Sequence, residues 1–332
     1  MSKYCKIGYV GDGYLPHVTE EDAKILTHIN IAFGHVENGF VKYTHLKNSD
    51  CIAKIRGYNP DIKILLSVGG WGAGGFSNAA STEAGCDKFA ESALAAYNVL
   101  GLDGIDIDWE YPCIGSAGID YSPNDKQTFT TMMRKLREVL PEKAMLTIAA
   151  GAGDYFLEST DMATVVSYLD YVQLMTYDMC GGKTTLHHTN LFTAGTIRKS
   201  SGDYAVKIFS EGGIPLEKLI LGAAFYSRDW RDVTSSENGG LYQESDTPIE
   251  FGPGFSELYE NCINKNGYVR HWDDTAKAPY LFNGKHFITY DDEESIAIKC
   301  EYVKEKGIGG IMYWEHSCDK TRRLLRVIGK NL

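Results

Sequence analysis

Long hydrophobic runs are missing from this sequence. No stretch approaches the roughly 18 consecutive apolar residues that a transmembrane helix needs, and the mean hydropathy is −0.25. Residues 1–10, MSKYCKIGYV, also lack the basic segment, apolar stretch and small-residue cleavage site of a secretion signal. We therefore expect a soluble protein without a membrane partner, whose signal was either removed or never present.

Basic residues are scarce relative to acidic ones: 33 Lys and Arg against 44 Asp and Glu give a formal net charge of −11. The phosphate backbone of nucleic acids and anionic membrane surfaces repel such a chain. No nucleic acid partner is therefore expected, and a neutral small molecule or polymer fits better. Aromatic residues are abundant, at 12% with 21 Tyr and 5 Trp, and their flat faces suit those of sugar rings.

Cysteine patterns typical of metal sites are also absent. The eight cysteines are scattered over the whole length and form neither a CxxC pair nor a Cys/His cluster with zinc spacing. We expect buried free thiols rather than a disulfide framework, and no metal or other cofactor. The cysteines do not indicate a cellular compartment.

The 332 residues, 43% of them hydrophobic, alternate between short apolar or β-branched runs and amphipathic helical stretches. This eightfold alternation predicts an α/β fold, a closed (β/α)8 TIM barrel, with a doubly wound open sheet as the alternative. The expected strands are Lys6–Val10, His28–Gly34, Lys63–Val68, Gly104–Glu110, Met145–Ala150, Tyr171–Tyr177, Leu219–Tyr226 and Gly310–Trp314.

One connection breaks the regular spacing. About sixty residues separate Tyr226 from Tyr290, too many for a structureless loop. We interpret residues 229–287 as a small α+β domain inserted after the seventh strand, which leaves 1–228 and 288–332 as the catalytic barrel. Because connections that leave the carboxyl ends of barrel strands surround the active site, the insertion is expected to form one wall of the cleft.

The strongest functional signal is a row of acids in the fourth expected strand. Side chains alternate along a strand, so Asp106, Asp108 and Glu110 share the face opposite Ile105, Ile107 and Trp109. Like charges this close raise one another's pKa and occupy positions where a barrel usually packs apolar residues. A metal site would need a hard ion, but the sequence has no Asp-rich calcium loop.

The pattern Asp103-x-x-Asp106-x-Asp108-x-Glu110 resembles the signature of the family 18 glycoside hydrolases, the chitinases and their relatives. The likeness covers essentially the whole chain, and the expected insertion is similar to that of the two-lobed, deep-cleft members. Similar motifs stand at Ser67–Trp71, Gln173–Asp178, Phe225–Arg228 and Gly309–Trp314.

This resemblance implies a retaining mechanism in which the substrate supplies the nucleophile. Glu110 would be the general acid and later the base, and Asp108 would orient the 2-acetamido group, whose oxygen attacks the anomeric carbon to give an oxazolinium intermediate. Asp106 would share a proton with Asp108, and Tyr177 would donate a hydrogen bond to the acetamido oxygen. Independently of the family, two adjacent aspartates titrate as a unit and raise the pKa of Glu110.

The resemblance also points to residues around this centre. Trp314 would form the floor beneath the sugar, while Asp178 would reach the leaving-side sugar together with Arg228 and Tyr226. Four further residues are expected to support the acid row, Asp103 and Ser67 by hydrogen bonds and the glycines by close backbone approach. The full expected set is Tyr9, Phe33, Trp71, Tyr111, Met175, Asp178, Tyr226, Arg228 and Trp314 for substrate, and Asp103, Ser67, Gly69 and Gly70 for support.

The sequence thus predicts a chitinase that cleaves β-1,4-linked N-acetylglucosamine polymers and oligomers, with chitin or chito-oligosaccharides as partner. One alternative is a non-catalytic lectin of this fold, which arises when the acid is lost; here Glu110 is present. Another is an endoglycosidase acting on the chitobiose core of N-glycans. A monomer is expected. The family points to an extracellular location, while the missing signal leaves a cytoplasmic one open.

Overall fold

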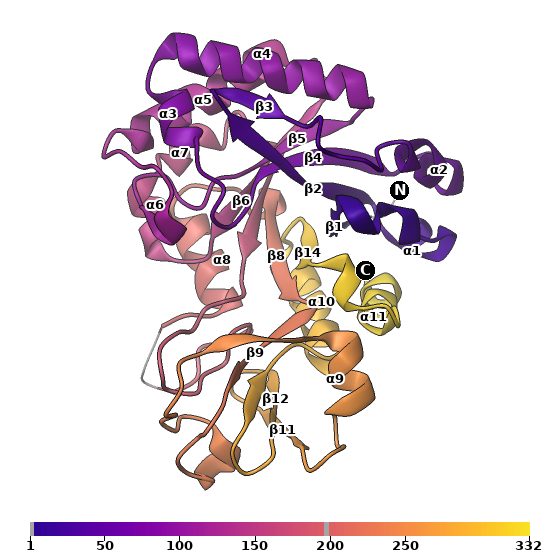
Figure 1. The fold of residues 1–332 in the computed structure, drawn as a ribbon, viewed down its shortest axis with the longest axis vertical. Helices are drawn as coiled ribbons and strands as arrows, with labels where there is room; N and C mark the ends of the chain where they lie inside the picture. Colours follow the sequence, from indigo (N-terminus) through magenta and orange to yellow (C-terminus); the bar gives the residue numbers. More distant parts are fainter. Residues whose placement is uncertain (1–2, 196–198) are drawn as a thin grey trace.

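Eight parallel strands close into a barrel in the computed structural model, which describes residues 3–195 and 199–332 (Figure 1). Neighbours in space follow chain order, and the first strand pairs with both the second and the last, which closes the sheet. The barrel strands are β1 (Cys5–Gly11), β2 (His28–Glu37), β4 (Lys63–Gly69), β5 (Gly104–Asp108), β6 (Met145–Gly151), β7 (Tyr171–Met175), β8 (Leu219–Ala224) and β14 (Gly310–Trp314).

This closure confirms the TIM barrel, and the open-sheet alternative is wrong. All eight expected strands exist, but three end earlier than predicted: β5 at Asp108, β7 at Met175 and β8 at Ala224. Glu110 and Tyr177 therefore lie in the connections just beyond the strands. Those connections lie at the barrel face where TIM-barrel active sites form.

Helices surround the barrel, and their termini follow local signals. The capping box expected of an Asp three residues after a Thr is present at the start of α1, where Thr19 and Asp22 each accept the other's backbone N–H. Gly101 ends the longest helix with φ of 63°. The helices are α1 (Glu20–Ile25), α2 (Cys51–Tyr58), α3 (Phe76–Ala80), α4 (Glu83–Leu100), α5 (Asp125–Val139), α6 (Asp154–Ser159), α7 (Met162–Val165), α8 (Gly202–Glu211), α10 (Glu293–Lys306) and α11 (Arg323–Asn331).

A second, antiparallel sheet lies beside the barrel, at the lower end of Figure 1, in the order β10-β9-β13-β12-β11. Its elements are β9 (Tyr226–Trp230), β10 (Glu250–Gly254), α9 (Phe255–Asn261), β11 (Val269–Asp273), β12 (Ala278–Phe282) and β13 (Phe287–Thr289). The sheet extends beyond the expected bounds 229–287. It starts at Tyr226, because β9 follows β8 almost directly, and it ends at Thr289. A short strand, β3 (Phe40–Lys42), pairs antiparallel with the end of β2.

The insertion packs in two ways. Trp230, Phe282 and Phe287 belong to an apolar cluster separate from the main core, which also includes Leu186 of the connection between β7 and α8. In contrast, Phe255 and Leu258 of α9 lie in the same hydrophobic core as the barrel helices. The division into a barrel of 1–228 and 288–332 and a domain of 229–287 stays a prediction, and its first segment includes residues 1–2 and 196–198, which lie outside the described residues.

No helix within residues 3–195 and 199–332 is long and apolar enough to cross a membrane. The cysteines of this part of the chain form no disulfide, and Cys5, Cys86, Cys262 and Cys300 are buried.

Because α9 shares the barrel's core, we expect Phe255→Ala to destabilise the whole chain. Phe255 is 1% exposed, and truncating a buried Phe costs about 3–5 kcal/mol of unfolding free energy. Denaturant unfolding followed by circular dichroism should show one transition at a lower midpoint. Phe251→Ala, at a 68% exposed position of the same insertion, is the control and should cost less than about 1 kcal/mol. Two transitions, with the barrel's unchanged, would contradict this expectation.

Candidate active site

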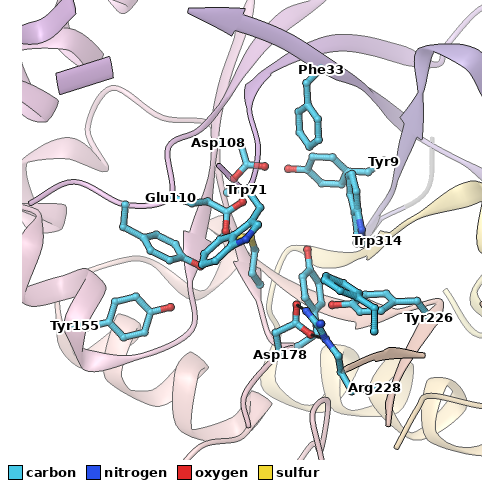
Figure 2. Close-up of a pocket in the computed structure, with 15 residues that line it drawn as sticks. Tyr9, Phe33, Trp71, Asp108, Glu110, Tyr155, Asp178, Tyr226, Arg228 and Trp314 are labelled. Atoms are coloured by element: carbon cyan, nitrogen blue, oxygen red, sulfur yellow. Dashed lines mark hydrogen bonds and ion pairs between the residues drawn. The ribbon is translucent and has the colours of Figure 1, made fainter. Parts of the chain in front are cut away.

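A cleft of about 710 Å³ opens at the carboxyl ends of the barrel strands, beside the insertion (Figure 2). The nine residues predicted to bind substrate all line it, as do three of the four predicted catalytic residues, Asp108, Glu110 and Tyr177. Three lining residues were not predicted: Ala149, Tyr155 and Phe251. The structure thus gathers side chains from most of the barrel strands and from the insertion around one space.

The acid row begins below the cleft floor. Asp106 and Asp108 lie on β5, and Glu110 follows two residues later; the three are 0%, 4% and 8% exposed. On the other face of the strand Trp109 stacks on Phe76 at 5.2 Å between ring centroids. The predicted alternation therefore holds, and it directs all three carboxyl groups toward the barrel interior.

Asp106 accepts four hydrogen bonds. Oδ2 accepts them from the hydroxyls of Tyr9 at 2.9 Å and Ser67 at 2.7 Å, while Oδ1 accepts them from Thr147 at 2.7 Å and from the Gln173 amide at 2.8 Å. Burial raises the pKa of Asp106, and these hydrogen bonds oppose the rise. The support expected from Ser67 is present, whereas the donors Thr147 and Gln173 were not predicted.

Asp108 and Glu110 have strongly perturbed acidities. Burial, then the charges of Glu110 and Asp106, raise the pKa of Asp108 well above its usual range. Burial likewise raises the pKa of Glu110 to about 7, opposed by a hydrogen bond with Tyr111 and assisted by the charge of Asp178. The sequence predicts that the pair Asp106 and Asp108 raises the pKa of Glu110; in the structure desolvation is the main cause, and the contributing charge is that of Asp178. Within the described chain nothing donates to Oδ1 of Asp108, which therefore has an acceptor available to a ligand.

Tyr177 lies on the cleft side of this pair. Its hydroxyl contacts Sδ of Met312 at 3.8 Å, and its ring meets that of Tyr226 edge-on at 6.1 Å. Burial, followed by the charges of Asp108 and Glu110, raises the pKa of Tyr177 well above its usual value. The hydroxyl therefore keeps its proton, and a thioether is a weak acceptor that a better one can replace.

An ion pair closes the opposite side of the cleft (Figure 2). Arg228 donates to both oxygens of Asp178, at 2.6 and 2.8 Å, and the ring of Phe251 lies 3.4 Å from its guanidinium. Burial alone would raise the pKa of Asp178, but hydrogen bonds from Arg228 and His188 lower it below its ordinary value. Asp178 is thus an anion bound to Arg228; its predicted contact with the leaving-side sugar stays a prediction.

Aromatic rings make up much of the remaining lining. Trp314 stacks on Phe33 at 5.3 Å, and Tyr9 meets Trp314 edge-on at 5.8 Å. Trp71 is 63% exposed, so its ring has a free face. Tyr155, which packs against Tyr111 at 5.3 Å, was missed although it follows the end of a barrel strand, the position by which other lining residues were found.

The two predicted glycines allow close packing around the acid row. A Cβ on Gly69 would lie 2.0 Å from the carbonyl oxygen of Asp108, and one on Gly70 would lie 2.8 Å from the ring of Phe33. Both have positive φ, 122° and 94°, which favours glycine. Any side chain here would displace β5 or the aromatic lining.

Asp103 lies just before β5, below the three acids. It accepts hydrogen bonds from Arg56 at 2.6 Å and from the backbone of Ile64 at 2.9 Å. Arg56 lies on α2 and Ile64 at the start of β4, at the end of the barrel away from the cleft. Asp103 therefore joins β4 and α2 at the start of β5, the strand that carries the acid row, and its predicted part in holding that row stays a prediction.

Residues 3–195 and 199–332 include no group of three or more His, Cys, Asp or Glu side chains that could hold a metal ion. The chemistry available in the cleft is that of one acid with a pKa of about 7, two further carboxyl groups and five tyrosine hydroxyls, that of Tyr177 among them. This set can donate a proton, orient an amide and remove a proton from water.

Comparison with known proteins agrees with this geometry. A family model described as "Glycosyl hydrolases family 18" matches residues 7–319. Chitinase A1 of Niallia circulans is 38% identical over 83% of this chain, which spans only 43% of that relative, and chitinase B of Serratia marcescens is 29% identical over 90%, spanning 74% of it. The solved structure of a family 18 N-acetylglucosaminidase from Paenibacillus barengoltzii is 52% identical, with a TM-score of 0.97, over 99% of this chain and 100% of that one.

The raised pKa of Glu110 predicts a pH-dependent stability difference. In the folded chain Glu110 keeps its proton up to about pH 7, whereas in the unfolded chain it releases the proton near its ordinary pKa of 4.5. The unfolding free energy of the native chain therefore falls as the pH rises between these values. Gln is neutral throughout. Glu110→Gln should therefore match the native chain near pH 4.5 and exceed its unfolding free energy by roughly 3 kcal/mol near pH 8.

Urea unfolding at both pH values measures this difference, with the exposed Glu142→Gln as the control. A constant difference across pH would show that Glu110 ionises normally.

Proposed function

The chain belongs to glycosyl hydrolase family 18, and on that premise we propose that it is a chitinase that hydrolyses β-1,4-linked N-acetylglucosamine polymers and oligomers with substrate assistance. The observation that carries this proposal is the pairing of Glu110, whose pKa is about 7, with Asp108, whose Oδ1 has no donor among the described residues. The first group suits proton donation at neutral pH, and the second suits an amide N–H.

Cleavage begins with the glycosidic bond. Glu110 gives its proton to the glycosidic oxygen, so that the leaving sugar departs as an alcohol. The acetamido oxygen of the sugar that remains forms a bond to the anomeric carbon as the glycosidic bond breaks, which gives a cyclic oxazolinium ion. Asp108 accepts the acetamido N–H, and Tyr177 donates to the acetamido oxygen; both interactions fix the group for attack.

Hydrolysis then reverses these roles. Glu110, now a carboxylate, removes a proton from water. The oxygen of that water bonds to the anomeric carbon as the bond from this carbon to the acetamido oxygen breaks, which opens the oxazolinium ring. The anomeric carbon is thus attacked twice, from opposite faces, so the product retains the β configuration. Glu110 regains its proton, and the acetamido group is restored. No group other than the substrate and water is consumed.

The cleft suits a neutral sugar chain. Trp314, Phe33 and Trp71 offer aromatic surface to the apolar faces of sugar rings. An uncharged polymer is not repelled by a chain with a net charge of −11. The complete acid row argues against a lectin, since Glu110 is in place. The expected monomer and extracellular location stay predictions.

A second candidate activity is release of single N-acetylglucosamine units. The observation that favours it is the 52% identical structure, described as an N-acetylglucosaminidase, which matches this chain over its full length. Both activities use the same acid row, so the chemistry of the site does not choose between them. They differ in how many sugars the cleft accepts on either side of the cleaved bond.

Partly acetylated chitosan tests the substrate's role as nucleophile. If the acetamido oxygen attacks, the sugar on the non-reducing side of each cleaved bond must carry an acetyl group. We expect new reducing ends to be N-acetylglucosamine alone, with fully deacetylated chitosan and cellulose oligomers inert as controls. Sequencing the products measures this. A substantial fraction of glucosamine at the new reducing ends would mean that a carboxylate of the enzyme is the nucleophile.

Products from chitin oligomers of increasing length separate the two candidate activities. A chitinase should accumulate the disaccharide and leave it uncut, because binding on both sides of the bond requires a longer chain. Chromatography of early time points shows this pattern. Monosaccharide from every oligomer at early times, the disaccharide included, would instead establish the N-acetylglucosaminidase.

A further inference from the structure

The barrel floor beneath the cleft contains a layer of polar side chains. Six of the eight barrel strands contribute one residue, each at most 2% exposed, where TIM barrels usually pack branched apolar side chains. These residues are Tyr9 on β1, Asn30 on β2, Ser67 on β4, Asp106 on β5, Thr147 on β6 and Gln173 on β7. Buried polar groups are costly unless they are hydrogen-bonded, so this layer must be ordered as a network.

The four donors to Asp106 differ in one respect. Tyr9, Ser67 and Thr147 act through hydroxyls, which can rotate and accept a hydrogen bond if Asp106 becomes protonated. The NH2 group of Gln173, 2.8 Å from Oδ1 of Asp106, can only donate. Gln173 is therefore the one donor of the four that cannot accept a proton placed on the carboxyl oxygen it contacts, Oδ1, without turning over its amide.

Asn30 holds that amide in the donating orientation. Its Nδ2 donates to Oε1 of Gln173 at 3.0 Å, while Nε2 of Gln173 also reaches Oγ1 of Thr147 at 3.2 Å. If the Gln173 amide turned over alone, two NH2 groups would face each other and its oxygen would face the Asp106 carboxylate. The donating amide and the ionised Asp106 therefore favour one another.

We propose that Gln173, oriented by Asn30, is a positioning residue that keeps Asp106 as the carboxylate, so that the single proton of the aspartate pair stays on Asp108. The consequence for turnover rests on the proposed function. A protonated Asp108 is neutral, so it accepts the acetamido N–H without a second buried charge beside Asp106. Gln173 and Asn30 would act through Asp106 and touch no substrate.

The surroundings of Asp106 fit this assignment. The titratable groups that face it are Asp108 on its own strand, Tyr9 on β1 and Tyr177 after β7. Both tyrosines keep their protons, since burial raises the pKa of each well above its usual value. The negative charge of Asp106 contributes to the raised pKa of Asp108, in the direction that retains the proton there.

The test without substrate locates the proton directly. Infrared spectra of protein with isotope-labelled aspartate report protonated carboxyl groups. Near neutral pH we expect a protonated aspartate signal in the native chain that Asp108→Asn removes and Asp106→Asn retains. The opposite result, a signal lost only in Asp106→Asn, would overturn the proposal. Because no substrate is present, this outcome does not depend on whether the proposed function is right.

The second test is the pH profile of kcat/KM. Gln173→Met keeps the side chain's length but removes the donor. With one hydrogen bond fewer, the carboxylate form of Asp106 is less stable, and the aspartate pair takes up its second proton at higher pH. The acid limb of the kcat/KM profile should therefore move up by about one pH unit. Asn30→Leu, which releases the amide, should move the limb in the same direction by less. In both variants kcat should fall more than KM changes.

Tyr302→Phe is the matched control, because it removes a buried tyrosine's 2.9 Å hydrogen bond to Asp203 on the outer helices. It should lower stability without moving the acid limb. An unchanged profile in folded Gln173→Met would overturn the proposal, since a merely structural role predicts that result. If Gln173→Met does not fold, Asn30→Leu and the infrared comparison decide.

Discussion

Three carboxyl groups buried in one row are the constraint on which the rest of the structure depends. Moving a charge out of water is expensive unless hydrogen bonds or a change of protonation compensate. The barrel uses both responses: Asp106 has four donors, while Asp108 and Glu110 have raised pKa values. The apolar filling common to TIM barrels is replaced by a polar layer at this depth because the acids require it.

The insertion completes the cleft and is tied to the barrel by the same kind of interaction. Asp178 follows β7 of the barrel, and Arg228 lies on β9 of the inserted sheet; their bidentate ion pair joins the two parts beside the acids. Phe251, from the neighbouring strand β10, covers the guanidinium. The charge of Asp178 in turn raises the pKa of Glu110, so Arg228 of the antiparallel sheet fixes a charge that affects the acidity of Glu110.

Much of the site could be predicted because its pattern is local. Strand alternation placed Asp106, Asp108 and Glu110 on one face. Strand ends located four of the nine cleft residues, and the family resemblance located the other five. Contacts between distant segments could not be predicted in this way. Asp103 shares the motif with the acids, but only the fold shows that its partners are Arg56 and Ile64, and no local signal distinguished Phe251 within its long insertion.

The sequence by itself determined the barrel's eight strands and the face on which the acids lie, because hydrophobic period and side-chain alternation are properties of neighbouring residues. It also carried the short motifs that resemble those of family 18. Only the tertiary structure decided which groups meet those acids. Thr147 and Gln173 reach Asp106 through the register between β5, β6 and β7, and burial brings the pKa of Glu110 to about 7. Register and burial depend on closure of the whole barrel, which no single segment encodes.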